Sequence, residues 1–172
     1  MSRVYFGRKG GCVMARDSYC STISLLNSTG FDYRIHDFGA GKVTDVQGDW
    51  PFPVESLLKT LAFQIRQEWV LVALRATDRL DYRRLADHFG VSRTAIASPS
   101  PEVVEAALGA EMGGVGPIPP DNEVKVLFDA NVLDKDVVFC GVGRNGKTLE
   151  IGLQDLLQVT KGQVAAVVRQ DD

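Results

Sequence analysis

The other elements of this chain are arranged around one segment, Glu111-Met112-Gly113-Gly114-Val115-Gly116-Pro117-Ile118-Pro119-Pro120. Its glycines allow bends that other residues cannot follow, and the prolines after them stiffen the chain. Such a segment can present bare backbone N–H and C=O groups to a ligand at a low entropic cost. Gly and Pro also mark ordinary turns, so a tight connection between a helix and a strand is the alternative interpretation.

Length and composition indicate one globular domain. The chain has 172 residues, of which 45% are hydrophobic and 24% are charged, enough for a proper hydrophobic core. Lys and Arg number 19 against 22 Asp and Glu, so the formal net charge is -3. This balance disfavours a broad basic face that captures nucleic acid at long range. If RNA is the partner, the contact must be local.

The sequence contains no segment typical of a membrane span or a secretory signal. The apolar stretch Trp69–Leu74 is much shorter than a bilayer requires. Arg3, Arg8 and Lys9 stand near the N-terminus, but no apolar run follows them. We therefore expect a cytoplasmic protein, and we treat residues 1–20 as an N-terminal extension, which can be disordered.

The cysteines do not indicate a disulfide framework or a metal site. Cys12, Cys20 and Cys140 are odd in number and lack the spacing of zinc ligands, so we expect no metal and no cofactor. Cys140 with His36 and an acid would make a thiol nucleophile, but a buried structural cysteine is the favoured interpretation. Since no pair of carboxylates stands out, catalysis would have to depend on backbone groups, one lysine and the substrate itself.

That lysine is Lys59, the single charge in the apolar stretch Ser56–Ile65. Burial disfavours the charged form of a lysine unless the ammonium has a partner. Either the side chain reaches the surface along its apolar stem, or the ammonium serves a polar pocket. The sequence alone leaves both alternatives open.

Periodicity and turn signals predict short helices and strands. Strands at 56–65 and 69–74 should form an antiparallel hairpin. We expect helices capped by Asp81 and Gly90 and by Ser100 and Gly109. The other expected elements are a helix from Ser21 or Thr22 to Gly30, strands at 31–35, 94–97, 124–128, 137–140, 148–151 and 164–168, a single turn capped by Asp129, and a helix at 153–160. This mixture predicts the α+β class, with a mixed, mostly antiparallel sheet in a single domain at 21–172.

A second glycine loop, Gly141-Val142-Gly143-Arg144-Asn145-Gly146, matches the spacing G-x-G-x-x-G. Residues 141–148 also match the P-loop pattern G-x-x-x-x-G-K-T. Both patterns need a helix N-terminus to hold phosphate groups. The residues after this loop alternate as in a strand, so phosphate binding at 141–148 is a minor alternative.

Four segments of the chain, taken in order, resemble one protein family. They are Ser56–Phe63, Leu80–Ala86, Gly113–Pro117 and Gly143–Gly146. Together they resemble the YbaK/prolyl-tRNA-synthetase-associated editing domains, which are aminoacyl-tRNA deacylases, over nearly the whole chain. The resemblance implies a compact, barrel-like α+β fold without metal. It also implies hydrolysis of the ester between a mischarged amino acid and the tRNA 3′ end.

The resemblance further implies which residues form the site. Lys59 matches the family's functional lysine, which holds the terminal adenosine, and the backbone of Gly113–Pro117 would position the aminoacyl group. Lys59 and Gly113 are therefore the expected catalytic residues. The expected substrate-binding residues are Thr60, Gly114, Val115, Gly116, Pro117, Gly141, Gly143, Phe31, Tyr33 and Phe38. The implied partners are the CCA end of a mischarged tRNA, of the tRNA(Pro) type carrying Ala, Cys, Ser or Thr, and an aminoacyl-tRNA synthetase.

The chain departs from the family in two places. Residues 42–53 replace the Ala-rich helix of many relatives, and Gly141 stands where some relatives have serine. Within the first departure, Trp50 and Phe52 form either a hydrophobic plug or the wall of a ligand site. The departures leave open which amino acid is removed. A non-catalytic tRNA- or synthetase-binding module of the same fold is the alternative function.

Overall fold

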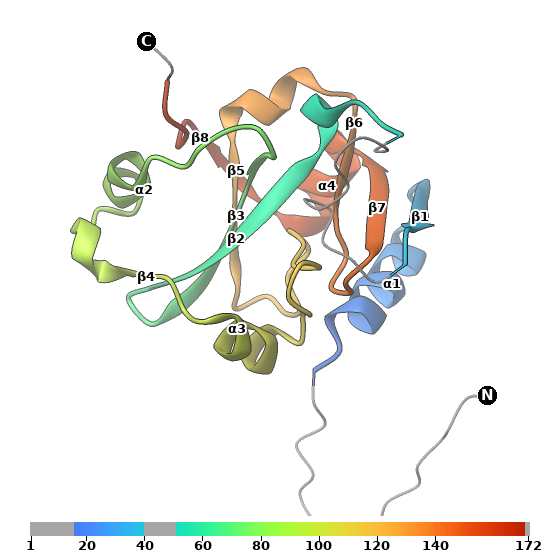
Figure 1. Ribbon diagram of the computed structural model, residues 1–172, viewed down its shortest axis with the longest axis horizontal. Helices are drawn as coiled ribbons and strands as arrows, with labels where there is room; N and C mark the ends of the chain where they lie inside the picture. The colour runs from blue at the N-terminus through green and yellow to red at the C-terminus, as the bar shows by residue number, and fades with distance from the viewer. Residues whose placement is uncertain (1–15, 40–50, 171–172) are drawn as a thin grey trace, which may run out of the picture.

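Two β-sheets pack against each other with short helices around them in the computed structural model, which describes residues 16–39 and 51–170 (Figure 1). The first sheet has the order β1-β7-β6 and the second has the order β4-β2-β3-β5-β8. The first sheet consists of β1 Tyr33–Asp37, β7 Lys147–Gly152 and β6 Val137–Gly141. The second consists of β4 Ile96–Ala97, β2 Leu58–Ile65, β3 Glu68–Arg75, β5 Lys125–Asp129 and β8 Gln163–Ala165.

The pairing of the strands confirms the predicted α+β class. The first sheet is antiparallel throughout, whereas β3, β5 and β8 of the second sheet run parallel to one another. The structure divides the predicted mixed sheet into two sheets, which a parallel bridge between Leu57 and Phe139 connects. This bridge brings the beginning of β2 beside β6, and the closure of the two sheets produces the barrel-like arrangement.

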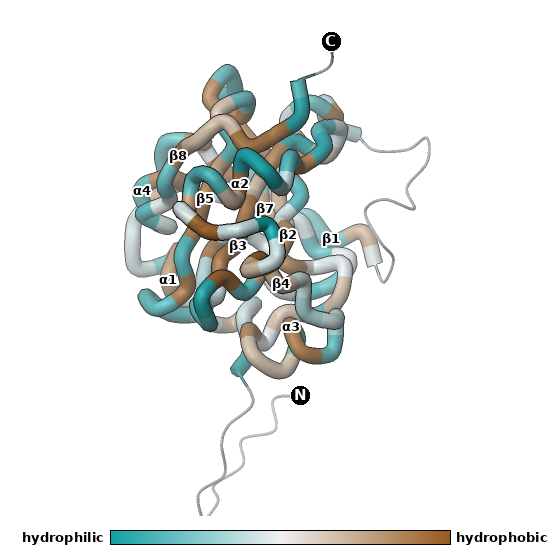
Figure 2. The backbone as a smooth tube through the Cα atoms, turned by 90° about the vertical axis from the view of Figure 1, so that its left-hand side faces the viewer, coloured by the Kyte–Doolittle hydropathy of each residue, from teal (hydrophilic) through white to brown (hydrophobic). Residues whose placement is uncertain are grey.

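The predicted hairpin of β2 and β3 is confirmed, and it forms the centre of the second sheet. Arg66 and Gln67 make its tight turn with φ of 52° and 68°, the left-handed values that a two-residue hairpin requires. β3 is apolar on both faces because both are covered, as the hydropathy colouring of Figure 2 illustrates. Leu71 and Ala73 face the first sheet, while Val72 and Leu74 face the helix that follows the hairpin.

That helix is α2, Tyr82–Phe89, and its predicted caps are confirmed. The Asp81 carboxylate accepts hydrogen bonds from the backbone N–H groups of Arg83 and Arg84, and Gly90 ends the helix with φ of 62°. Leu85 and Ala86 are buried against β2 and β3. The other helices are α3 Pro101–Leu108 and α4 Leu153–Thr160, with 3-10 turns at Val54–Ser56, Arg93–Ala95 and Ala130–Asp134.

The predicted cap of the first helix was wrong. α1 covers Ser18–Thr29, because the Asp17 side chain accepts from the backbone N–H of Cys20 and begins the helix before Ser21. Its end at Gly30, with φ of 75°, agrees with the prediction. Asp17 is exposed, and its pKa is lowered chiefly by the hydrogen bond from Cys20. A carboxylate at this position also suits the positive end of the helix dipole.

The last strand is shorter than the predicted 164–168. β8 ends at Ala165, and the N–H groups of Val167 and Val168 donate to Asp129 Oδ2 at 2.8 and 3.1 Å. Asp129 is fully buried, and its other oxygen accepts from Asn131 at the predicted turn. The Asp129 carboxylate therefore accepts the hydrogen bonds that these N–H groups would otherwise donate to a neighbouring strand in a longer β8. Within the described residues, no helix is long and apolar enough to cross a membrane.

Candidate active site

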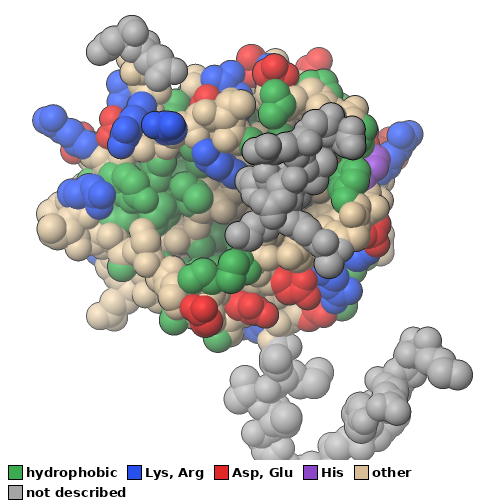
Figure 3. All heavy atoms as spheres, viewed as in Figure 1, with side chains coloured by type: hydrophobic (Ala, Val, Ile, Leu, Met, Phe, Trp, Pro, Cys, Tyr) green, Lys and Arg blue, Asp and Glu red, His purple; other side chains and the backbone are tan. Residues whose placement is uncertain are grey.

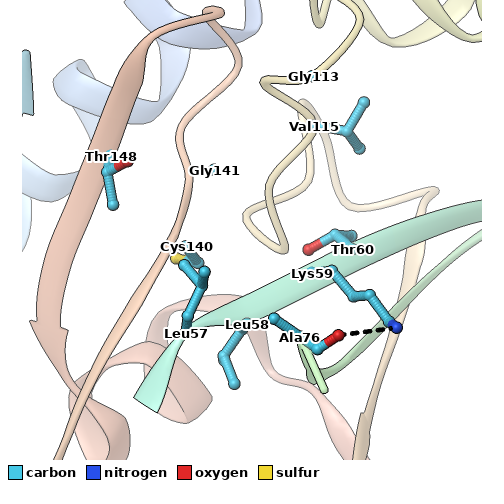
Figure 4. Close-up of a pocket in the computed structure, with 10 residues that line it drawn as sticks. All are labelled: Leu57, Leu58, Lys59, Thr60, Ala76, Gly113, Val115, Cys140, Gly141 and Thr148. Carbon is cyan, nitrogen blue, oxygen red and sulfur yellow. Dashed lines mark hydrogen bonds between the residues drawn. The ribbon is translucent and has the colours of Figure 1, made fainter. Parts of the chain in front are cut away.

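A cavity of about 250 Å³ lies where the two sheets meet the two glycine loops (Figure 4). It is smaller than the pockets of drug-sized ligands, so it suits a small group. One wall is the edge of β2, which pairs with β4 only at Gln64 and Ile65 and is otherwise unpaired on this side among residues 16–39 and 51–170. The lining residues are Leu57, Leu58, Lys59, Thr60, Ala76, Gly113, Val115, Cys140, Gly141 and Thr148.

Lys59 is half-buried at the edge of this cavity, and its ammonium is fixed by backbone carbonyls. Nζ donates a hydrogen bond to the carbonyl oxygen of Ala76 at 3.1 Å (Figure 4). It donates a second one to the carbonyl oxygen of Asp78 at 2.5 Å. An ammonium has three N–H groups, so one remains for a ligand. These two acceptors compensate the partial burial of the Lys59 ammonium.

The surroundings of Lys59 disfavour its charge. Burial, the largest cause, lowers the pKa of Lys59 below its ordinary value, the charge of Asp78 opposes this shift, and the nearby charge of Arg79 adds to it. The ammonium is therefore a poorly hydrated cation that two dipoles stabilise. Such a group interacts with an anionic or polar ligand more strongly than an exposed lysine does.

The two glycine loops form one unit by packing backbone against backbone. Gly143 N–H donates to the Gly114 carbonyl at 2.7 Å, and Glu111 N–H donates to the Gly143 carbonyl at 3.1 Å. A Cβ atom on Gly116 would lie 1.9 Å from the Gly141 carbonyl oxygen, and one on Gly141 would lie 2.4 Å from that of Val115. The main reason for the glycines in both loops is thus the close contact between the loops, and contact with a ligand is a second reason.

The cavity brings together five of the twelve expected site residues, namely Lys59, Thr60, Gly113, Val115 and Gly141. Gly113 is exposed and has φ of 82°, so its backbone is accessible at the cavity. The expected residues Gly114, Gly116, Pro117 and Gly143 are buried behind this surface and support it.

Phe31, Tyr33 and Phe38 do not line this cavity. They lie on or beside β1, which is the outer strand of the first sheet, so β7 separates them from β6. Tyr33 donates its hydroxyl to Asn27 at 2.6 Å, and the Phe38 ring stacks near His36 with centroids 6.2 Å apart.

Thr148 is a cavity residue that the sequence did not single out for this site. Its hydroxyl oxygen and that of Thr60 are buried, and neither has a hydrogen-bond partner in the described part of the chain. A buried hydroxyl without a partner is costly, and a polar ligand group would satisfy it. The sequence signal that could have identified Thr148 as a cavity residue is its inward position in the predicted strand at 148–151.

Cys140 cannot act as a nucleophile in this environment. Burial raises the pKa of its thiol to about 12, so the thiol stays protonated. His36 is instead paired with Glu150, its Nε2 lying 2.6 Å from Oε2. Phe52 stacks on Phe139 with ring centroids 4.1 Å apart, as in the plug interpretation, while Trp50 lies outside the described residues.

The P-loop match does not form a phosphate site. Residues 141–148 connect β6 to β7, and no helix begins there. The side chain of Lys147, which would bind phosphate in a P-loop, pairs with Asp37. Within the described ranges, no group of three or more His, Cys, Asp or Glu residues could hold a metal ion.

Comparison with known proteins identifies relatives of this chain. Residues 40–159 match the sequence model of the aminoacyl-tRNA editing domain. The proline--tRNA ligase of Staphylococcus saprophyticus subsp. saprophyticus is 31% identical over 94 residues, which are 55% of this chain and 16% of that enzyme. The same enzyme of Staphylococcus aureus strain Newman is 29% identical over 94 residues. The match thus spans about one sixth of the length of these curated relatives.

Solved structures share the fold. A crystal structure described as a candidate trans-editing enzyme for prolyl tRNA synthetase has a TM-score of 0.76 at 20% identity, over 89% of this chain and 98% of that one. A scaffold protein used for epitope backbone grafting has a TM-score of 0.76 at 21% identity, over 90% and 98% of the two chains. The family match covers well over half of this sequence and agrees with the shared fold. The chain therefore belongs to the aminoacyl-tRNA editing domain family.

Proposed function

We propose that this chain is a trans-editing deacylase, which hydrolyses the ester between an amino acid and the 3′ end of a mischarged tRNA. The observation that carries the proposal is one small cavity lined by both Lys59, whose ammonium is held by two backbone carbonyls, and the exposed glycine Gly113. Lys59 and Gly113 are the residues that we place at the reaction centre. Membership of the editing family supports the same assignment.

In the proposed reaction, water attacks the ester carbonyl carbon and the bond from that carbon to the ribose oxygen breaks. The proton lost by the water passes to the ribose oxygen, so the products are a free amino acid and an uncharged tRNA. Lys59 would bind the 3′-terminal nucleotide through its remaining N–H group. The backbone N–H of Gly113 would orient the ester and stabilise the developing oxyanion. An ester has a good enough leaving group for such positioning to suffice.

The cavity also supports a small amino acid as the group that is removed. Its volume is about 250 Å³, and Leu57, Val115 and Cys140 contribute apolar walls. The hydroxyls of Thr60 and Thr148 would receive polar groups of the substrate. We propose tRNA(Pro) carrying Ala, Cys, Ser or Thr, since the matching curated proteins are named proline--tRNA ligases. A cytoplasmic location and an association with a synthetase belong to the same proposal.

A panel of tRNA(Pro) charged with Ala, Cys, Ser or Thr tests this function. The wild-type protein should release at least one amino acid, and Lys59→Ala should not. Lys125→Ala is the matched control, because Lys125 is exposed and pairs only with Glu68 at the surface. Release by neither protein, with tRNA binding retained by the wild type, would support the non-catalytic binding module instead.

A further inference from the structure

Lys and Arg side chains gather on one face of this acidic protein, over α2 and the loop that precedes it (Figure 3). Arg79 lies in that loop, Arg83 lies in the first turn of α2, and Arg93 lies in the 3-10 turn after α2. All three are exposed, and we call them the arginine patch. The ion pairs of arginines in the described residues involve Arg16, Arg75, Arg84 and Arg144, so the arginine patch has no carboxylate partner there.

The carboxylates near the patch leave it with a positive charge. Asp81 serves as the cap of α2, where it accepts two backbone hydrogen bonds, and Arg84 lies 3.8 Å from it. Asp87 is exposed on α2, four residues after Arg83, and offsets part of the charge. Within the part of the chain that the structure describes, three guanidinium groups without an ion pair stand against one nearby carboxylate without one. They make a local positive field, although the whole chain has a net charge of -3.

The patch borders the candidate active site. Lys59 belongs to the α2-facing side of the second sheet, because it pairs in register with Leu74, which packs beneath α2. Its ammonium binds the carbonyl of Asp78, the residue directly before Arg79, and the charge of Arg79 lowers the pKa of Lys59. A ligand that reaches from Lys59 across this face therefore meets the arginine patch next.

The shape and chemistry of the patch suit a phosphate backbone. Guanidinium groups bind phosphate oxygens in two-pronged fashion and resist deprotonation, which suits them to nucleic acid. Arg93 is held in place, since its guanidinium carbon lies 4.0 Å above the ring of Tyr82, which packs edge-on against Phe63. A patch built partly on a fixed side chain loses less entropy on binding.

We propose that the arginine patch binds the phosphate backbone of the tRNA acceptor end and guides its 3′ terminus to Lys59. This inference rests on the proposed deacylase function for the identity of the RNA. Because the whole chain is acidic, any contact with RNA must be local, and the arginine patch supplies such a contact. Binding of the tRNA body then takes place at the arginine patch, apart from the hydrolysis of the ester. The affinity should then depend on salt, because each phosphate contact releases bound counterions.

The test is fluorescence anisotropy with labelled, uncharged tRNA(Pro), measured at several salt concentrations. Arg83→Ala and Arg93→Ala should each weaken binding about 3-fold or more at low salt, and each should reduce the slope of log Kd against log salt by about 0.7 to 0.9. Asp87→Ala should strengthen binding. Arg34→Ala is the matched control on β1 of the other sheet, where Arg34 is exposed, and it should bind as the wild type does.

Because the probe is uncharged tRNA, failure of this inference can be told apart from failure of the deacylase proposal. Release of an amino acid by the wild type, with equal tRNA affinity in the patch variants and Arg34→Ala, would overturn the patch and leave the deacylase intact. Patch-dependent tRNA binding without any release would support the patch and contradict the deacylase. No tRNA binding, together with patch-dependent binding of poly-glutamate, would overturn the RNA assignment in favour of an acidic protein.

Discussion

Lys59 combines two tasks at one atom. Its Nζ donates hydrogen bonds to the carbonyls of Ala76 and Asp78, and the residue also lines the cavity. The carbonyl dipoles compensate part of the cost of burying the charge, and a bound polar substrate would compensate more. The residue is therefore expected to affect stability modestly and reactivity strongly.

Replacement of Lys59 by methionine separates these two tasks. The methionine side chain has about the length of the aliphatic part of lysine, so it keeps the packing. The carbonyls of Ala76 and Asp78, however, lose their hydrogen-bond donor. The relief of a buried charge opposes this loss, so we expect the free energy of unfolding in urea to change by less than about 2 kcal/mol. A much larger loss would mean that Lys59 is mainly a structural residue.

The lowered pKa of Lys59 predicts a pH dependence. The unfolded chain binds more protons than the folded one between the lowered pKa and the ordinary value of 10.5. The contribution of Lys59 to stability therefore rises with pH across that window, as the penalty for burying the charge disappears. Any binding or turnover that needs the ammonium should fall across the same window.

Nuclear magnetic resonance can follow this titration directly through the 13C shift of the lysine ε-carbon, with Lys59→Arg to identify the signal. The signal of Lys59 should titrate below the ordinary lysine pKa of 10.5. Titration at that ordinary value would contradict the described environment.

At the scale of elements, the two glycine loops act as one. Their contact explains why glycines stand at 114, 116 and 141, where any Cβ would meet backbone atoms of the other loop. The loops in turn place Gly113 and Gly141 at the cavity. The site is thus built from a loop pair that a single added methyl group can separate.

Gly116→Ala tests this arrangement. The new Cβ would lie 1.9 Å from the Gly141 carbonyl oxygen, so the loops must move apart, and we expect a loss of about 2 to 3 kcal/mol in the free energy of unfolding. Gly152→Ala is the matched control, since its φ is -59° and the nearest group to its Cβ would be the flexible carboxylate of Asp155 at 3.3 Å, with the Asp136 carbonyl oxygen at an ordinary contact distance of 4.0 Å. Equal stability of the two variants would show that the loops do not depend on this contact.

Asp129 connects β5 to the C-terminal segment through its buried carboxylate. Asp129→Ala would leave the N–H groups of Val167 and Val168 without an acceptor, and we expect a loss of about 3 kcal/mol in urea unfolding. Asp134→Ala is the control, because Asp134 is exposed and its one ion pair among the described residues is with its neighbour Lys135, so its loss should be below about 0.5 kcal/mol. A similar small loss at Asp129 would contradict the role of this carboxylate.

Local signals account for the elements that were predicted correctly. The hairpin of β2 and β3, and the helix between Asp81 and Gly90, depend on alternation and caps that lie within a few residues. The start of α1 was misplaced because Asp17, Ser21 and Thr22 are all good caps. In the structure Asp17 caps the helix, and its carboxylate also pairs with the distant Arg144. The end of β8 was misplaced because the acceptor for its last N–H groups is a side chain from a distant element.

For the whole molecule, the site arises from a long-range closure. The bridge between Leu57 and Phe139 joins the two sheets and leaves the edge of β2 open to the cavity. No local pattern specifies this bridge, so the division into two sheets and the position of Thr148 could not be read from the sequence. The family resemblance led us to expect Lys59 beside the 111–117 loop. The structure adds to this expected site the buried hydroxyls of Thr60 and Thr148.

The measurement that tests the central claim most directly is single-turnover release of alanine from Ala-tRNA(Pro) by wild type, Lys59→Met and Lys125→Met. We expect the wild type and Lys125→Met to hydrolyse the ester at equal rates, and Lys59→Met to be slower by about 100-fold or more while it remains folded. Hydrolysis by a folded Lys59→Met at the wild-type rate would contradict the assignment of this cavity as the active site.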